Sequence, residues 1–366
     1  MFKNIAVMGV KDLAAWDDVT TVSQALADLG NNSGNLMFTH ALQSVVRGSV
    51  SVGFNPDQNM LSSCEAIIIA AANWVNEFED FGWLYSKLKT TKVPIFLVGI
   101  GAQASTTGLA PNVPEGTRKL LSLVSERSYS ISCRGDYSAE VLASLGITNV
   151  AVTGCPSLLT AGIKGPSLTN KRILKPSDIV IHGTRHFFQR ADIFQESIYR
   201  TAFNNGHDLI IQSELADIYY ALERKGNADI LSRSAAVLPD VYGADIDLID
   251  KYLRSHGHFY TNVADWAAYM AGKSFCIGTR IHGTIASLLA GTPAVLIAHD
   301  SRTREMAVSM SIPSIDTRQA VSFNEDLIEE IVSGFESASF LASYDSYYAS
   351  FSDFFSANGL SIRHSF

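Results

Sequence analysis

The segment SFCIGTRIHGTIASLLAGTPAVLIAHD, residues 274–300, contains two short apolar runs separated by a stretch that is expected to be helical. The runs SFCI and PAVLIA have the length and composition of buried strands. A strand, a helix and a strand in this order predict two parallel strands joined by a crossover helix. The segment therefore predicts an α/β fold built on a parallel sheet.

The same alternation continues along the rest of the chain. Apolar runs typical of buried strands are NIAVMGV, EAIIIAAA, VPIFLVGIG, YSISCR and NVAVTGC in the first half, and DIVIHG, HDLIIQS and HFYTN in the second. Helix-like stretches lie between them, such as residues 138–146, in which Gly146 suits a C-cap. The chain is thus expected to form two α/β domains.

Gly, Pro, Ser and Lys gather after residue 160, as they do in linkers. We place an N-terminal domain at residues 1–165, a linker at 166–177 and a C-terminal domain at 178–335. Residues 336–366 are expected to form a helical segment that packs back on the N-terminal domain. A length of 366 residues also exceeds what one compact core usually holds.

Composition argues against several classes of protein. Lys and Arg number 28 against 36 Asp and Glu, and this formal charge of -8 disfavours general binding to nucleic acid or to an anionic membrane. Apolar runs are too short to span a membrane and the first residues lack a signal-peptide cleavage site, so we expect a soluble, cytoplasmic protein. The four cysteines lie far apart. We expect buried free thiols, no metal site and no bound cofactor.

Polar and glycine-rich stretches follow several of the predicted strands. They are GIGAQ at 99–103, RGD at 134–136, HGTRH at 182–186 and RIHG at 280–283. Ligands of open parallel sheets collect beyond the carboxyl ends of the strands, which is where these stretches lie. GIGAQ is not a GxGxxG motif and no GxxxxGK[ST] occurs, so neither a dinucleotide site nor a Walker-type site is indicated.

Arg280 and His282 stand two residues apart between a strand and a helix. Their side chains should leave an extended turn on the same side, beside the free backbone N–H groups of the helix. An arginine fork matches carboxylate or phosphate, and the ordinary pKa of histidine suits proton transfer near neutral pH. The pair predicts an anion site that contains a titratable group.

Other candidates have structural alternatives. Arg134 could pair with Asp136, and Arg185 could lie in a surface loop. Arg302 could belong to a solvated helix start, which is the favoured interpretation for Arg304. The loop GNNSGN at residues 30–35 can present N–H groups to a ligand, or turn the chain and cap a helix.

Taken in order, NNSGN, GIGAQ, SCRGDYSAEVLASLGI, VTGCPSLL and GTRIHGTIASLLAGTPAVLIAHDSRTREMAVSMSIP resemble the polysaccharide pyruvyl transferase family from about residue 30 to 315. This resemblance implies a GT-B-like architecture with two Rossmann-like domains facing across a cleft. It also implies transfer of the enolpyruvyl carbons of phosphoenolpyruvate onto two sugar hydroxyls, which leaves a cyclic ketal and phosphate.

The resemblance carries Arg280, Ile281 and His282 over as residues that hold phosphoenolpyruvate, with His282 as the candidate proton donor. A carboxylate should activate the acceptor hydroxyl, for which Asp300 and Asp136 are the candidates. The family often has an acidic residue where Asn35 stands and a lysine where Arg302 stands, so the chain departs from the pattern at both positions. The predicted substrate-binding residues are Arg280, Ile281, Gly283, Arg134, Arg185, His182, Arg302, Asn32, Asn35 and Gln103.

The leading hypothesis is a transferase that moves pyruvyl from phosphoenolpyruvate to a sugar of an exopolysaccharide, capsule or cell-wall glycan precursor. The N-terminal domain would take the acceptor and the C-terminal domain the donor. A lipid-linked oligosaccharide acceptor would bring the protein close to a membrane surface. One alternative is a GT-B glycosyltransferase with a nucleotide-sugar donor, in which Glu305 could contact the ribose. Another is a non-catalytic carbohydrate-binding protein of the same fold.

Overall fold

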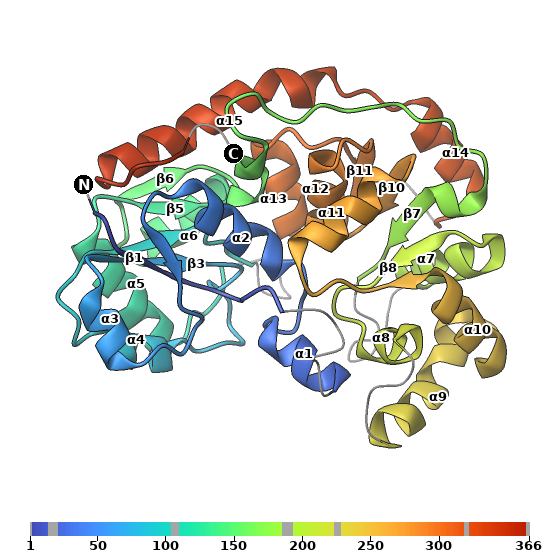
Figure 1. Cartoon of the computed structure of the whole chain (residues 1–366), viewed down its shortest axis with the longest axis horizontal. Helices are drawn as coiled ribbons and strands as arrows, with labels where there is room; N and C mark the ends of the chain where they lie inside the picture. Colours follow the sequence, from blue (N-terminus) through green and yellow to red (C-terminus); the bar gives the residue numbers. More distant parts are fainter. Residues whose placement is uncertain are drawn as a thin grey trace.

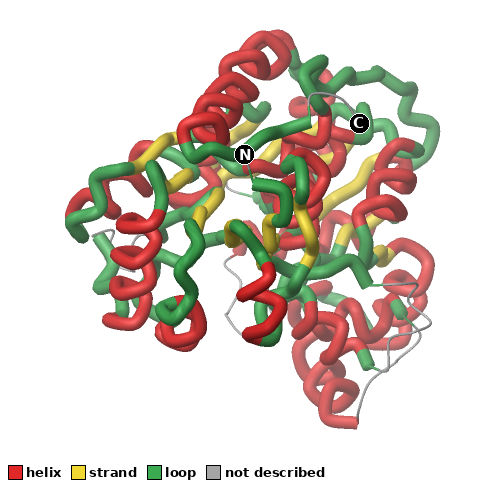
Figure 2. The backbone as a smooth tube through the Cα atoms, turned by 60° about the vertical axis from the view of Figure 1, so that its left-hand side comes forward, coloured by secondary structure: helices red, strands yellow, loops and turns green. Residues whose placement is uncertain are grey.

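The computed structural model describes residues 2–13, 21–103, 110–184, 193–222, 228–317 and 322–363. These residues form two α/β halves, each built on parallel strands with helices packed outside them (Figures 1 and 2). The predicted α/β fold of two Rossmann-like domains is therefore confirmed.

The first half is a parallel sheet of order β2-β1-β3-β4. The central strands β1 and β3 are apolar and buried along their whole length, as expected for a parallel sheet covered on both faces. A second parallel pair, β5 and β6, continues from it through a bridge between Ile100 and Cys133. The strands are β1 (Ile5–Met8), β2 (Ser49–Ser51), β3 (Ala66–Ala70), β4 (Ile95–Val98), β5 (Ile131–Cys133) and β6 (Val150–Val152). The helices are α1 (Val22–Asp28), α2 (Asn35–Val45), α3 (Gln58–Ser63), α4 (Gly82–Leu88), α5 (Glu115–Arg127) and α6 (Asp136–Ser144), followed by a short 3₁₀ helix at Pro156–Ala161.

The second half has six parallel strands in the order β12-β11-β10-β7-β8-β9. They are β7 (Ile179–His182), β8 (Asp208–Ile210), β9 (Gly257–His258), β10 (Phe275–Gly278), β11 (Ala294–Ala298) and β12 (Ser314–Asp316). The helices are α7 (Ile193–Asn205), α8 (Leu215–Ala221), α9 (Ala228–Tyr242), α10 (Ile246–His256), α11 (Val263–Ala271), α12 (Ile281–Leu289) and α13 (Ser301–Ser309), with a 3₁₀ turn at Pro176–Asp178. The strand predicted at HFYTN is only the two-residue β9, an edge strand that pairs with β8 alone.

The last helices connect the two halves. Helix α14 (Glu325–Ser333) lies beside the second sheet, and α15 (Ala338–Ala357) runs across both halves toward the first (Figure 1). The hydroxyl of Tyr347 donates to the Cys155 carbonyl (2.6 Å), and Asn358 Oδ1 accepts from the backbone N–H of Tyr129 (3.0 Å). In the segment after α15, the Arg363 N–H donates to the Val45 carbonyl (2.7 Å). The C-terminal residues thus pack on the N-terminal half.

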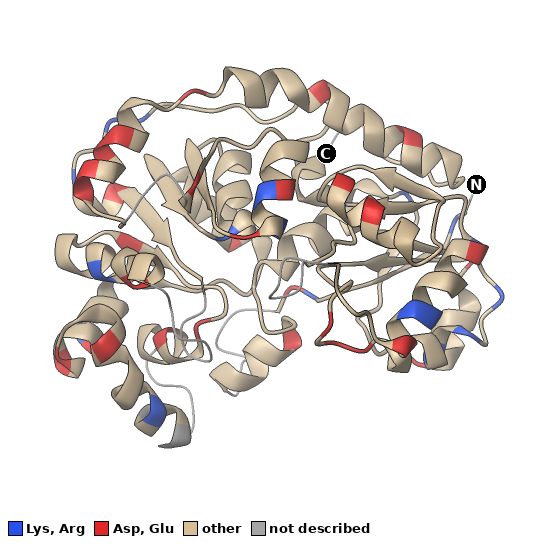
Figure 3. Cartoon of the chain, turned by 180° about the vertical axis from the view of Figure 1, so that it is seen from behind, with Lys and Arg blue, Asp and Glu red and all other residues tan. Residues whose placement is uncertain are grey.

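Charged side chains are spread over both halves. In the view of Figure 3, the Lys and Arg positions are scattered along the ribbon of both halves. None of the helices in the described ranges combines the length and the apolar composition needed to cross a bilayer. All four cysteines are buried and free; the sequence predicts this for Cys133, Cys155 and Cys276.

Candidate functional site

The turn between β10 and α12 carries Arg280 and His282. Arg280 is the N-cap of α12, and His282 lies in its first turn with a 6% exposed side chain. The neighbouring strand β7 ends at His182, whose Nδ1 accepts from the Arg280 N–H (3.0 Å). A Cβ at Gly278 would lie 2.0 Å from the His182 carbonyl oxygen, so only glycine fits where these strand ends meet. His182 therefore holds the backbone of the Arg280 turn through this hydrogen bond.

The Arg280 guanidinium is held by groups of the C-terminal half. Its Nε donates to the Gly183 carbonyl (2.9 Å), and one terminal nitrogen contacts both Ser213 Oγ and the Glu214 carboxylate. Glu214 is 2% exposed and also accepts from the backbone N–H groups of Gln212 (3.1 Å) and Ser213 (3.0 Å). The charge of Arg280 is thus balanced by a buried carboxylate that the sequence analysis did not identify. Glu214 follows β8, so a search of all residues beyond the carboxyl ends of the strands would have included it.

His282 lies in a closed environment between the two halves. Its ring is 5.4 Å from that of Phe38, and its Nε2 is 3.6 Å from Cys155 Sγ. Burial, together with the positive charges of Arg134 and Arg280, lowers the pKa of His282 to about 3. The expectation of a pKa near neutrality is wrong, because the imidazolium would lose its hydration beside two cations.

Arg134 enters from the N-terminal half and differs from Arg280 in its partners. It is 2% exposed, and its Nε donates to the Gly99 carbonyl (2.8 Å) while another nitrogen donates to Asn73 Oδ1 (3.0 Å). Among the described residues it forms no ion pair with a carboxylate, and the alternative pairing with Asp136 is not observed. Arg134 is therefore a nearly enclosed cation without a carboxylate in direct contact, and Glu305 acts on it only through a longer-range charge interaction.

Asp300 and Arg302 form an ion pair at the start of α13. Asp300 is the N-cap of that helix and accepts from the Thr303 N–H (2.8 Å). Burial alone would raise the pKa of Asp300, but Arg302 and His299 outweigh it and hold the pKa well below the usual range. Asp300 does not line the cavity described below, so its predicted role as a base is not supported. It orients Arg302. Arg304, expected to be solvated, instead pairs with Asp316 of β12 (2.7 Å).

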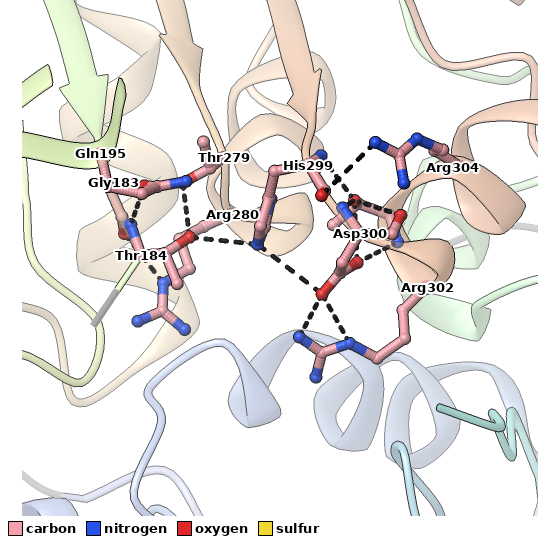
Figure 4. Close-up of polar contacts among 10 residues, drawn as sticks. Gly183, Thr184, Gln195, Thr279, Arg280, His299, Asp300, Arg302 and Arg304 are labelled. Carbon is pink, nitrogen blue, oxygen red and sulfur yellow. Dashed lines mark hydrogen bonds and ion pairs between the residues drawn. The ribbon is translucent and has the colours of Figure 1, made fainter. Parts of the chain in front are cut away.

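A chain of polar contacts connects the ends of β10, β7 and β11 (Figure 4). The Thr184 hydroxyl is 2.8 Å from the Thr279 hydroxyl and 3.3 Å from His299 Nε2, which is 3.6 Å from Asp300 Oδ2. These contacts connect the strand end that carries Arg280 with the helix start that carries Arg302.

The Asn/Gly loop of the N-terminal half packs directly on these residues. The Ser33 N–H donates to the Gln212 carbonyl (2.9 Å), and a Cβ at Gly34 would lie 2.8 Å from both His282 Nδ1 and Gln212 Oε1. The Asn35 amide donates to the carbonyls of Leu29 (2.9 Å) and Gly30 (3.3 Å), which a carboxylate could not do. This explains why the chain has asparagine where the family often has an acid.

The loop and the strand ends enclose a cavity of about 410 Å³ between the two halves. Eight of the residues predicted from the sequence line it: Arg280, Ile281, His282, Arg134, Arg302, Asn32, Asn35 and Gln103. Gly283 and His182 do not. A Cβ at Gly283 would lie 2.7 Å from His182 Cδ2, so this glycine is required for packing. Arg185 lies outside the described residues.

Several lining residues were not identified from the sequence. Gln212 follows β8 and is 1% exposed, and its Nε2 has no hydrogen-bond partner in the part of the chain that is described. Asn73, Thr184 and His299 also lie on the wall. Gln212 offers a buried, unused donor to a ligand in the cavity. Nowhere in the described ranges do three His, Cys, Asp or Glu side chains gather in a way that could hold a metal ion.

Comparisons with known proteins identify one family and several distantly similar structures. No curated protein matches the sequence significantly. Similar solved structures include MnaA of S. aureus with UDP (14% identity, TM-score 0.47, covering 97% of this chain and 94% of that one) and UDP-N-acetylglucosamine 2-epimerase from Rickettsia bellii (8% identity, TM-score 0.46, 98% and 96%). These likenesses are too distant to carry an argument about this chain. The model of the polysaccharide pyruvyl transferase family matches residues 27–301, which is more than half of the sequence. The chain therefore belongs to the polysaccharide pyruvyl transferase family.

Proposed function

We propose that this protein transfers the pyruvyl group of phosphoenolpyruvate to two hydroxyls of a sugar in a glycan precursor and forms a cyclic ketal. The observation that carries this proposal is the cationic wall of the cavity between the halves. Arg134, Arg280 and Arg302 all lie on it, and Arg134 is buried without a carboxylate partner. Such a site favours a small, highly charged anion, and phosphoenolpyruvate carries both a phosphate and a carboxylate.

Neutral donors complete the proposed donor site. The amide of Gln212 offers an unused N–H, and the first turn of α12, where a helix has free backbone N–H groups, lines the cavity at Ile281 and His282. Because Arg280 and Arg302 are held by Glu214 and Asp300, their positions are set before a ligand arrives. We assign Arg134 the largest share of donor affinity.

The reaction requires two proton movements. A proton is added to the methylene carbon of phosphoenolpyruvate, one sugar hydroxyl attacks the central carbon, and the second hydroxyl displaces phosphate. Of the two hydroxyl protons, one balances the new methyl group and the other leaves on the hydrogen phosphate. We assign the first donation to His282. A bound phosphate and carboxylate would offset Arg134 and Arg280 and raise the pKa of His282 above about 3.

The alternative of a nucleotide-sugar donor relied on Glu305 as the residue that would contact the ribose, and the structure does not favour this role. The Glu305 carboxylate accepts from the Ser138 N–H (2.7 Å) and hydroxyl (2.9 Å), and it does not line the cavity. A ribose contact from Glu305 would require these bonds to break.

Calorimetric titration of the full chain with phosphoenolpyruvate and, separately, with UDP-N-acetylglucosamine tests the donor. We expect saturable binding of phosphoenolpyruvate alone. Phosphate release and a pyruvate ketal in the product, seen by NMR with glycan acceptors, then test the reaction. Binding of UDP-N-acetylglucosamine with no binding of phosphoenolpyruvate would contradict the proposal.

A further inference from the structure

A second cavity, of about 430 Å³, adjoins the donor cavity and shares part of its wall, including Asn35, Trp74 and Glu79. Phosphoenolpyruvate was assigned to the donor cavity, so the proposed function does not yet use this second cavity. Its walls carry the rings of Phe38, Phe54, Trp74, Phe81 and Trp83, and we call it the aromatic cavity.

The aromatic rings lie close to one another on the wall of this cavity. Trp74 stacks on Phe81 with centroids 4.3 Å apart and planes 19° from parallel, and Phe54 lies 5.9 Å from Trp74. Trp83 is 50% exposed at the opening. A pyranose ring has C–H groups on one face and hydroxyls around its edge, so it can stack on such rings while its hydroxyls stay free. The chemical class that fits is a hexopyranose.

Glu79 stands where the two cavities meet, because it lines both of them. Its backbone is fixed on both sides. Asn76 Oδ1 accepts from the Glu79 N–H (2.8 Å), and the Thr117 hydroxyl donates to the Glu79 carbonyl (3.3 Å). The Glu79 carboxylate forms no hydrogen bond or ion pair within the described ranges.

The other carboxylates near the cavities accept hydrogen bonds or form ion pairs, and none of them lines the donor cavity. Asp80, which lines the aromatic cavity, accepts from the Gly82 N–H (2.9 Å). Asp300 binds Arg302, Glu214 binds Arg280, and Glu305 binds Ser138. Among the described residues, Glu79 is the carboxylate on the donor-cavity wall that is available to accept a proton.

From this arrangement we infer that Glu79 is the general base for an acceptor hexopyranose stacked in the aromatic cavity, an inference that rests on the proposed function. The hydroxyl oxygen forms its bond to the central carbon of the donor, and the hydroxyl proton passes to a Glu79 carboxylate oxygen. Attack by the second hydroxyl then breaks the bond from that carbon to the phosphate oxygen, and the proton of this hydroxyl returns to His282, which had protonated the methylene carbon. The proton held by Glu79 leaves with the phosphate. The carboxylate is thereby restored, and no further reactant is needed.

The test compares Glu79→Gln with wild type in a coupled phosphate-release assay. We expect kcat to fall by about 100-fold or more while the KM for phosphoenolpyruvate stays within about threefold. Glu77→Gln removes the same charge two residues away, at a position that lines neither cavity, and should keep wild-type kinetics. Glu79→Asp should recover part of the lost kcat. A Glu79→Gln variant with near wild-type kcat would overturn the role of Glu79.

A second measurement tests sugar binding in the aromatic cavity, the proposed acceptor subsite, without turnover. Saturation-transfer NMR with methyl galactoside and methyl mannoside should show ring C–H contact with the wild type. That signal should be lost in Trp74→Ala and retained in Trp74→Phe. Unchanged transfer in Trp74→Ala would overturn the subsite even if ketal is made. Absence of ketal from every acceptor, with phosphoenolpyruvate unbound, would instead overturn the proposed function, and the role of Glu79 with it.

Discussion

Arg134 differs from the other two arginines of the cavity in the charge around it. Arg280 and Arg302 each contact a carboxylate, whereas Arg134 donates to carbonyl oxygens of the backbone and of Asn73. Burying an unpaired cation is costly, so a protein that keeps one usually supplies its counter-charge from a ligand. In this site the ligand is the proposed donor.

We therefore expect Arg134→Lys to weaken phosphoenolpyruvate binding by about 1.5–3 kcal/mol, or roughly 10- to 150-fold in Kd, because an ammonium cannot make the same fork of bonds. Calorimetry measures the change. Arg304→Lys is the matched control, since Arg304 is paired with Asp316 and does not line the cavity. Equal donor affinity in the Arg134→Lys variant and wild type would remove Arg134 from the donor site.

The protonation of His282 should depend on the donor. Burial and two arginines keep the pKa of His282 at about 3, so the ring is neutral at pH 6. A bound anion raises that pKa, so the complex should take up protons as it forms, and affinity should increase as pH falls from about 7 to 5. Titrations in two buffers of different ionisation enthalpy measure the uptake. The His282→Asn variant should lose the proton uptake that is due to this residue. If the variant takes up as many protons as wild type, another group binds the proton.

Among the elements, the loop before α2 packs closely against the opposite half. Gly34 leaves no room for a side chain, because a Cβ there would be 2.8 Å from His282 Nδ1 and 3.0 Å from Asn32 Oδ1. Its φ of -58° suits any residue, so the need for glycine comes from space and not from backbone conformation. The loop thus positions His282 from the N-terminal half.

Gly34→Ala should separate the loop from β8 and α12, reducing donor affinity more than 10-fold and stability by about 1–3 kcal/mol. Calorimetry and thermal melting measure the two effects. Gly272→Ala provides the comparison, since Gly272 has a φ of -80° and the nearest atom to its added Cβ is 3.3 Å away. If Gly34→Ala binds phosphoenolpyruvate as wild type does, the contact between the loop and His282 is not needed for the donor site.

At the scale of the whole molecule, α15 makes the two halves one unit. Its aromatic side chains Phe351 and Phe355 are fully buried, and Tyr347 reaches the Cys155 carbonyl next to His282. The helix follows the C-terminal half in the sequence, but it packs on the N-terminal half. We therefore expect both halves to unfold in a single transition.

Phe351→Ala should remove about 3–5 kcal/mol of stability and lower the melting temperature of the whole chain, because it leaves a cavity under α15. Differential scanning calorimetry shows whether the transition remains single. Leu341→Ala on the same helix is 38% exposed and should cost less than about 1 kcal/mol. Two separate transitions in the wild type would show that the halves fold independently.

The sequence by itself determined the architecture and three of the cavity's main residues. Short apolar runs alternating with helical stretches specify parallel strands, because periodicity and strand length are local properties. Arg134, Arg280 and His282 were found in the same way, since each follows a strand whose end must face the ligand side of a parallel sheet.

Only the tertiary structure decided the electrostatics of the site. Glu214 is 66 residues from Arg280 in sequence, and Asn73 is 61 residues from Arg134, so no local pattern connects them. The low pKa of His282 likewise comes from burial by the opposite half and from an arginine of another sheet. Local spacing shows which strand end a residue follows, but the charge and water around that residue depend on which distant segments fold against it.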